Sequence, residues 1–235
     1  RDHPDYQVYL DLKAVDLRKL AALIQEYGVA KQIIFAHNTV ATCQEMKAAV
    51  PGLRAGVWIG GTAKEIYTKF QKLSQDKFAG LDLVQLHLDP SAYGAWPYAL
   101  TEAQLYQALA ATQAAGIPLE VLPFQVDCDD LEALISMGIR WFATDEPARF
   151  KACLDTMGTK NFLANGVTAH RGDSANHPEN TLAAIDSALA LGVDWIEIDI
   201  HRSSEGALVV IHDDRTGRVG DSDLVVAEST VDELR

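Results

Sequence analysis

The feature that most constrains the fold of this chain is a regular alternation of short apolar runs with helical patterns. Eight runs are predicted to form strands. They are Val8–Leu12, Gln32–Phe35, Arg54–Ile59, Leu83–Leu88, Leu119–Val126, Ile139–Ala143, Val167–His170 and Trp195–Ile200. Helical patterns separate nearly all of them, and glycines such as Gly28 and Gly192 mark helix ends. Strands that alternate with helices favour parallel pairing.

Eight such strand–helix units predict an α/β fold, a (β/α)8 TIM barrel. The chain has 235 residues, and such barrels typically need about 250. An open doubly wound sheet is the alternative, because the alternation alone does not distinguish a closed sheet from an open one. No glycine-rich dinucleotide-binding sequence follows the first strand, which favours the barrel. After the eighth strand, Leu208–Ile211 is predicted to form a hairpin arm.

The acidic composition excludes some classes of partner. The chain has 20 Lys and Arg against 33 Asp and Glu, for a net charge of −13. We therefore expect no nonspecific nucleic-acid binding, which needs clustered basic residues, although a local site for an anion remains compatible with this charge. No apolar run is long enough to predict a transmembrane segment. The widely spaced Cys43, Cys128 and Cys153 are interpreted as three partly buried thiols.

Charged side chains gather where predicted strands end. Glu197 and Asp199 are two residues apart in one strand, so both point to the same side of it. Two buried carboxylates need a cation or hydrogen bonds, whereas carboxylates at a solvated strand end do not, and the pattern leaves both interpretations open. Asp11 and Lys13 repeat this spacing in the first strand, where the pair alone is more typical of a solvated strand end.

Two histidines complete a set of residues suited to phosphodiester cleavage. His170, followed by Arg171, and His212 end two further runs. In a barrel, the carboxyl ends of all strands meet at one mouth. There, a cation would offset charge on the phosphoryl oxygens, Lys13 and Arg171 would hold them, and the histidines would act as general acid and base. Carboxylate ligands without thiolates favour Mg²⁺ or Ca²⁺.

These residues resemble the glycerophosphodiester phosphodiesterase family. Ala169-His170-Arg171-Gly172, followed by Pro178-Glu179-Asn180-Thr181, is similar to the family's opening signature. Gly192–Asp199 and Leu208–Asp213 continue the resemblance in the same order, so that it is strong over residues 167–235. The first part of the chain resembles the family's later half more weakly, at Leu10-Asp11-Leu12-Lys13 and at Ala143-Thr144-Asp145-Glu146-Pro147.

The resemblance implies metal-dependent hydrolysis of a small glycerophosphodiester to glycerol 3-phosphate and an alcohol, with a divalent cation, Mg²⁺ or Ca²⁺, as cofactor. It assigns each candidate residue a role. His170 and His212 would be the catalytic acid and base, Glu197, Asp199 and Asp11 the metal ligands, Arg171 and Lys13 the phosphate-binding residues, and Glu179 a further residue lining the site.

One departure from the family leaves the substrate open. Asp11 stands where the family has Glu, and an Asp-x-Lys strand is instead similar to sphingomyelinase D-type phospholipases. A phospholipase D-like or sphingomyelinase D-like lipid phosphodiesterase is therefore an alternative function. A non-catalytic barrel is another, and it would be expected to have lost some of the ligands.

The order of the two halves also departs from the family. Residues 1–157 resemble the family's C-terminal half, residues 158–165 form a junction, and residues 166–235 resemble the N-terminal half. A circular permutant, a fragment spanning two tandem domains, or joined pieces of a longer chain would each give this order. Because the first and last strands of a barrel are neighbours, a permuted chain can close the same site. We expect residues 1–235 to form a single phosphodiesterase barrel.

Overall fold

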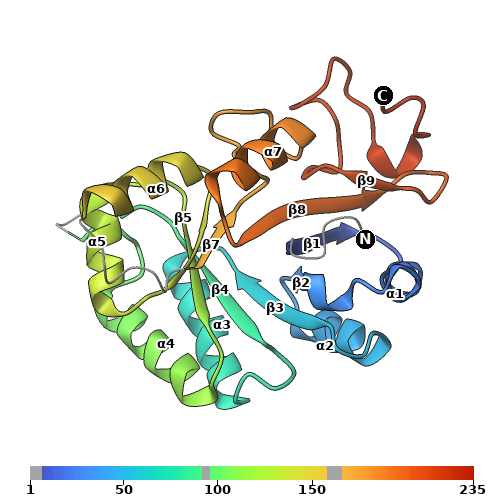
Figure 1. Cartoon of the computed structure of the whole chain (residues 1–235). Helices are drawn as coiled ribbons and strands as arrows, with labels where there is room; N and C mark the ends of the chain where they lie inside the picture. Colours follow the sequence, from blue (N-terminus) through green and yellow to red (C-terminus); the bar gives the residue numbers. More distant parts are fainter. Residues whose placement is uncertain (1–6, 92–95, 158–165) are drawn as a thin grey trace.

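Eight parallel strands close into a barrel in the computed structural model, which describes residues 7–91, 96–157 and 166–235 (Figure 1). The strands are β1 (Val8–Ala14), β2 (Ile33–His37), β3 (Arg54–Ile59), β4 (Leu83–Leu88), β5 (Leu119–Pro123), β6 (Trp141–Thr144), β7 (Gly166–Ala169) and β8 (Trp195–Arg202). Each strand pairs with the next one in sequence, and β1 pairs with β8. The predicted TIM barrel is therefore confirmed, and the open-sheet alternative is wrong. The predicted junction, residues 158–165, lies outside the described residues.

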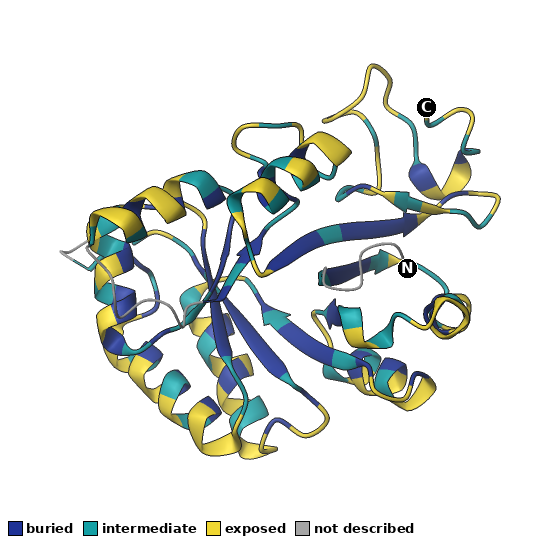
Figure 2. Cartoon of the chain, in the orientation of Figure 1, coloured by how far each residue is buried: buried dark blue, intermediate teal, exposed yellow. Residues whose placement is uncertain are grey.

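Helices cover the outside of the barrel and leave their outer faces exposed (Figures 1 and 2). They are α1 (Leu17–Tyr27), α2 (Val40–Ala49), α3 (Ala63–Gln75), α4 (Glu102–Ala115), α5 (Cys128–Met137), α6 (Pro147–Thr156) and α7 (Leu182–Leu191), with 3-10 turns at Ala30–Gln32 and Val226–Glu228. Local sequence sets their ends. Thr62 and Thr101 form capping boxes, and Gly28 and Gly192 end helices in the left-handed conformation.

Most strand boundaries differ from the predicted ones by one to three residues, and two boundaries differ for clear local reasons. β5 ends at Pro123 rather than Val126, because proline has no N–H to donate to a neighbouring strand. α7 begins at Leu182 rather than Asn180, because Asn180 has a φ of 59° and the Thr181 side chain caps the helix. The predicted hairpin arm is confirmed as β9 (Leu208–Val210), which pairs antiparallel with β8. Within the described ranges, no helix combines the length and the apolar character needed to cross a membrane.

Alternation along the strands separates the apolar core from the polar interior. Leu10 and Leu12 of β1 point outward into the main core beneath the helices, and Tyr9, Asp11 and Lys13 line a pocket inside the barrel. Below this pocket, a buried layer of polar side chains crosses the barrel. The Glu120 carboxylate accepts hydrogen bonds from Gln85 Nε2 and Thr168 Oγ1, each at 2.6 Å. The inward-facing side chains at this end of the barrel are therefore largely polar, whereas the outward-facing ones belong to the apolar core.

The cysteines correct one prediction. Cys128, the first residue of α5, forms a disulfide with Cys153 of α6, and Cys43 is a buried free thiol. The interpretation as three thiols is therefore wrong for two of them. Their separation of 25 residues gave no indication of a pair, because only the packing of α6 beside α5 brings them together.

Candidate active site

Three acidic side chains meet where β1 and β8 lie side by side. The register pairs Asp11 with Asp199 across the two strands, and Glu197 lies on β8 two residues before Asp199. All three side chains are buried, and one carboxylate oxygen from each lies within 4.8 Å of the others. This spacing gives the cluster enough carboxylate oxygens to hold one hard divalent cation.

The contacts within this acidic cluster fit a cation. Lys13 Nζ lies 2.7 Å from Asp11 Oδ2 and 3.1 Å from Asp199 Oδ1, so its ammonium group contacts two of the three carboxylates. Asp199 Oδ1 is buried, and its 3.1 Å ion pair with Lys13 lacks hydrogen-bond geometry. Burial raises the pKa of Glu197, and the neighbouring charge of Asp199 raises it further. A divalent cation would neutralise the negative charge that Lys13 leaves unbalanced.

Side chains from other elements hold these carboxylates in place. Asn180, just before α7, donates from Nδ2 to Asp199 Oδ2 at 2.9 Å and accepts from the Asp199 backbone N–H at 3.2 Å. Trp58 of β3 donates from Nε1 to Asp11 Oδ1 at 3.0 Å. Burial would raise the pKa of Asp199, but the charge of Lys13 and the Asn180 hydrogen bond outweigh it and lower this pKa. Asp199 is thus held as the ionised member of the cluster.

His170 directly follows β7 and is paired with a carboxylate. Its Nδ1 atom lies 2.6 Å from Asp145 Oδ1, and its Nε2 atom lies 4.0 Å from Glu197 Oε2. Burial would lower the pKa of His170, but the hydrogen bond with Asp145 and the charge of Glu197 outweigh burial and raise it. Ser174 donates to Asp145 Oδ1 at 3.2 Å. Asp145 therefore fixes the His170 ring with Nε2 facing the acidic cluster.

The backbone turn after His170 shows why Arg171 and Gly172 suit these two positions. Arg171 has a φ of 59°, and its backbone N–H donates to Glu197 Oε2 at 2.9 Å. Its Nε atom lies 3.4 Å from Asp199 Oδ2. Gly172 has a φ of 80°, and a Cβ atom there would lie 2.7 Å from the backbone carbon of Ala184 in α7. Glycine at this position therefore lets the turn pack directly on α7.

His212 comes from the segment after β9 and has its own carboxylate. Its Nδ1 atom lies 2.7 Å from Asp213 Oδ1, and Arg218 Nε donates to Asp213 Oδ2 at 2.6 Å. Arg218 also donates to both oxygens of Glu179, at 2.8 and 2.7 Å, while Arg171 Nη1 donates to Glu179 Oε1 at 3.2 Å. A chain of ion pairs thus joins the turn after β7 to the loop that carries His212.

Trp58, His87 and Phe124 form an aromatic wall of the mouth pocket, which has a volume of about 240 Å³. The His87 ring stacks on Trp58 at 5.2 Å, and Phe124 meets His87 edge-on at 5.4 Å. Burial, followed by the charges of His170, Lys13 and Arg171, lowers the pKa of His87 to about 4. The Tyr9 hydroxyl is buried in the pocket lining and has no hydrogen-bond partner among the described residues.

The predicted site residues thus converge on one mouth. Residues lining the mouth pocket include Asp11, Lys13, His170, Arg171, Glu197 and His212, with Asp199 beside Lys13 and Glu179 bound to Arg171. Other residues contacting this set were missed. Asp145 was quoted only within a strand-end motif, and Trp58 and Arg218 carried no motif at all. The sequence signal for Asp145 was its place two residues after a predicted strand, where side chains reach the mouth.

Comparison with known proteins shows which family part of the chain resembles. Residues 170–235 match the model of the Glycerophosphoryl diester phosphodiesterase family. This segment is thus similar to that family. It contains His170, Glu197 and His212, so the resemblance stated from the sequence is confirmed there. The weaker resemblance of residues 1–157 lies outside the match and stays a prediction.

Curated relatives match a segment of similar length. A glycerophosphodiester phosphodiesterase of Caldanaerobacter subterraneus is 46% identical over 69 residues, which cover 29% of this chain and 28% of the relative. One from Bacillus altitudinis is 41% identical over 69 residues, with the same coverage. The chain thus spans 28% of the length of each of these relatives.

Solved structures match nearly the whole barrel. The phospho-2-dehydro-3-deoxyheptonate aldolase of Thermotoga maritima has a TM-score of 0.52 and 12% identity, covering 86% of this chain and 63% of that one. The N-acetylneuraminate lyase of Fusobacterium nucleatum has a TM-score of 0.51 and 10% identity, covering 83% of this chain and 70% of that one. At this identity, the likeness shows the fold alone.

Proposed function

We propose that the chain is a metal-dependent phosphoric diester hydrolase that cleaves glycerophosphodiesters to glycerol 3-phosphate and an alcohol. The observation that carries this proposal is the mouth pocket. It brings His170 and His212 together with Arg171, Lys13 and the acidic cluster. The family match of residues 170–235 supports the same reaction.

Each group in the mouth has a role in this proposal. Asp11, Glu197 and Asp199 hold Mg²⁺ or Ca²⁺, because oxygen ligands without thiolates suit hard cations. When bound, the cation supplies positive charge that polarises the phosphoryl group. Arg171 and Lys13 bind the phosphoryl oxygens. Glu179 orients Arg171 through the 3.2 Å hydrogen bond.

The two histidines carry out the proton transfers. One imidazole accepts a proton from the attacking water as the water oxygen bonds to phosphorus. The other donates a proton to the leaving oxygen as the ester P–O bond breaks. His170 is held by Asp145 and His212 by Asp213. Each histidine therefore has its Nε2 atom available for the substrate.

Substrates with different leaving groups test these roles. We expect the purified chain to hydrolyse glycerophosphocholine and bis(p-nitrophenyl) phosphate with Mg²⁺ or Ca²⁺ and to lose activity in EDTA. On glycerophosphocholine, His170→Ala and Glu197→Ala should each lower turnover by about 10²-fold or more, and His177→Ala is the matched control. Near wild-type rates for both site variants would contradict the site, and no hydrolysis with either metal would contradict the function.

Comparing the two substrates also shows which histidine is the general acid and which is the general base. p-Nitrophenolate leaves without a proton, so the variant lacking the general acid should retain activity on the nitrophenyl diester and lose it on glycerophosphocholine. The variant lacking the base should lose activity on both substrates. Equal losses of His170→Ala and His212→Ala on both substrates would contradict an acid–base pair.

The lipid phosphodiesterase alternative needs apolar or aromatic loops free to contact a membrane. Trp96 lies in the loop after β4. Its Nε1 atom donates to the Leu100 backbone oxygen at 2.7 Å, and its ring packs edge-on against Tyr98. These contacts favour a packing role for Trp96, so the soluble diester is the better-supported substrate.

We also propose that residues 1–235 form one barrel with its halves in permuted order. Support comes from two pairs of neighbouring strands that join the halves. β6 pairs with β7, and β1 pairs with β8. A site-specific protease sequence inserted between Met157 and Gly166 tests this. After cleavage, the two pieces should elute together under native conditions, whereas pieces that separate and remain folded would favour a fragment of two tandem domains.

A further inference from the structure

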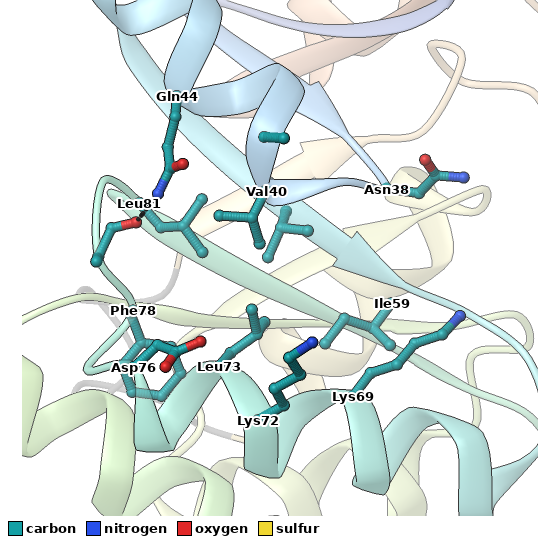
Figure 3. Close-up of a pocket in the computed structure, with 13 residues that line it drawn as sticks. Asn38, Val40, Gln44, Ile59, Lys69, Lys72, Leu73, Asp76, Phe78 and Leu81 are labelled. Atoms are coloured by element: carbon teal, nitrogen blue, oxygen red, sulfur yellow. Dashed lines mark hydrogen bonds between the residues drawn. The ribbon is translucent and has the colours of Figure 1, made fainter.

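A second pocket, of about 710 Å³, lies on the outside of the barrel between α2 and α3 (Figure 3). Its walls are mostly apolar. Val57 and Ile59 of β3, Leu73 of α3 and Val40 of α2 line it together with Phe78. Sites for small apolar ligands typically enclose about 300–1,000 Å³. Its lining has no residue in common with the mouth pocket, so it is separate from the proposed active site.

Two lysines give this outer pocket a positive charge. Lys69 and Lys72 lie on α3, and Figure 3 shows their side chains reaching toward the space between the helices. Neither ammonium group lies within 4.0 Å of a carboxylate oxygen in the ranges that the structure describes. They are therefore available to an anion from outside the chain.

The ends of the outer pocket differ in charge. At one end, Gln44 Nε2 donates to the Ala79 backbone oxygen at 2.8 Å and links α2 to the segment after α3, near Phe78 and Asp76 (Figure 3). Asn38 and Lys69 lie at the opposite end. An anionic group is therefore favoured near Lys69 and disfavoured near Asp76. The apolar part of a ligand would extend toward Phe78.

We propose that the outer pocket binds a free fatty acid, with its carboxylate at Lys69 and Lys72 and its acyl chain along β3. The apolar walls would leave the polar groups of a sugar or nucleotide without partners. The two lysines favour a carboxylate over a neutral lipid. The pocket follows α3 from Lys69 to Asp76, about 10 Å along the helix, which suits an elongated single chain. Neither the site nor its test depends on the proposed hydrolase activity.

Calorimetric titration of the full chain with laurate below its micelle concentration tests the site. We expect saturable binding with one laurate per chain. Ala41 lines the pocket on α2 and is exposed. Ala41→Trp fills the space and should weaken binding by about tenfold or more. Ala48→Trp, on the same helix but outside the lining, should leave it unchanged. Unsaturable binding, or equal binding by both tryptophan variants, would overturn the proposal.

A charge variant provides a second measurement that does not depend on filling the pocket. Lys69→Gln combined with Lys72→Gln should weaken laurate binding by about tenfold and leave the affinity for 1-dodecanol unchanged. Lys64→Gln, on α3 but outside the lining, is the matched control. An equal loss for laurate and dodecanol, or no loss for laurate, would contradict the assignment of the lysines to the carboxylate.

Discussion

The Nδ1 atom of His170 and the Oδ1 atom of Asp145 lie 2.6 Å apart, across the seam between β7 and β6. The pair joins the two parts of the chain, because Asp145 comes before the predicted junction and His170 after it. The hydrogen bond sets the tautomer of the ring. Nδ1 carries the proton that faces the carboxylate, and Nε2 faces the acidic cluster. Asp145 is thus a positioning residue for a proposed catalytic histidine.

Replacing Asp145 should impair turnover more than substrate binding. In Asp145→Asn, the amide can donate to Nδ1 and favour the other tautomer, so we expect kcat to fall by about 10²-fold with a smaller change in KM. Because this hydrogen bond raises the pKa of His170, the limb of the pH–rate profile that reports His170 should move to lower pH. Ser174→Ala, which removes the 3.2 Å contact to Asp145 and the 3.0 Å hydrogen bond to the His170 backbone oxygen but leaves the Asp145 carboxylate in place, should have a minor effect. A Ser174→Ala defect as large as that of Asp145→Asn, with no shift in the profile, would indicate a merely structural role.

Glu197→Gln should separate metal binding from folding. Glu197 is buried against Asp199, and both burial and this charge raise its pKa. Removing the charge should therefore stabilise the metal-free protein, raising its Tm by about 2–4 °C for each kcal/mol gained. The variant should also lose the Tm increase that Mg²⁺ or Ca²⁺ gives the wild type. Differential scanning calorimetry in EDTA and in each metal measures both effects.

The exposed Glu132 of α5 provides the control for that measurement. Glu132→Gln should keep the metal-dependent increase in Tm. An increase that survives in Glu197→Gln would exclude Glu197 from the metal site.

The site was predictable from the sequence only where its geometry is local or follows from the fold class. The spacing of Glu197 and Asp199 puts both on one side of a strand wherever that strand lies. That Asp11 joins them depends on closure of the barrel and on the β1–β8 register, which pairs Asp11 with Asp199. The eight strand–helix units favoured closure without excluding an open sheet, and the register follows from packing along both strands. The link from Arg218 to Glu179 depends on a loop whose path no short pattern encodes.

Burial of His87 in the aromatic wall should make the stability of the protein depend on pH. Burial and nearby positive charges lower the pKa of His87 to about 4, whereas an unfolded histidine has a pKa of about 6.5. Between these values the unfolded state binds more protons, so this contribution to stability increases with pH across the window. On going from pH 7 to pH 4, the free energy of unfolding of the wild type should fall by up to about 3 kcal/mol more than that of His87→Gln. Urea unfolding at several pH values measures the difference, and parallel curves would contradict it.

The disulfide between Cys128 and Cys153 should stabilise the α5–α6 side of the barrel. It closes a loop with a sequence separation of 25 residues, for which loss of the cross-link costs about 3 kcal/mol through the added entropy of the unfolded chain. Cys128→Ser should therefore lower the free energy of unfolding, and its Tm should not respond to dithiothreitol. Wild type and Cys43→Ala both retain the disulfide, so dithiothreitol should lower the Tm of each. A wild-type Tm that is the same with and without reductant, while mass spectrometry detects reduced Cys128, would show that the disulfide does not stabilise the fold.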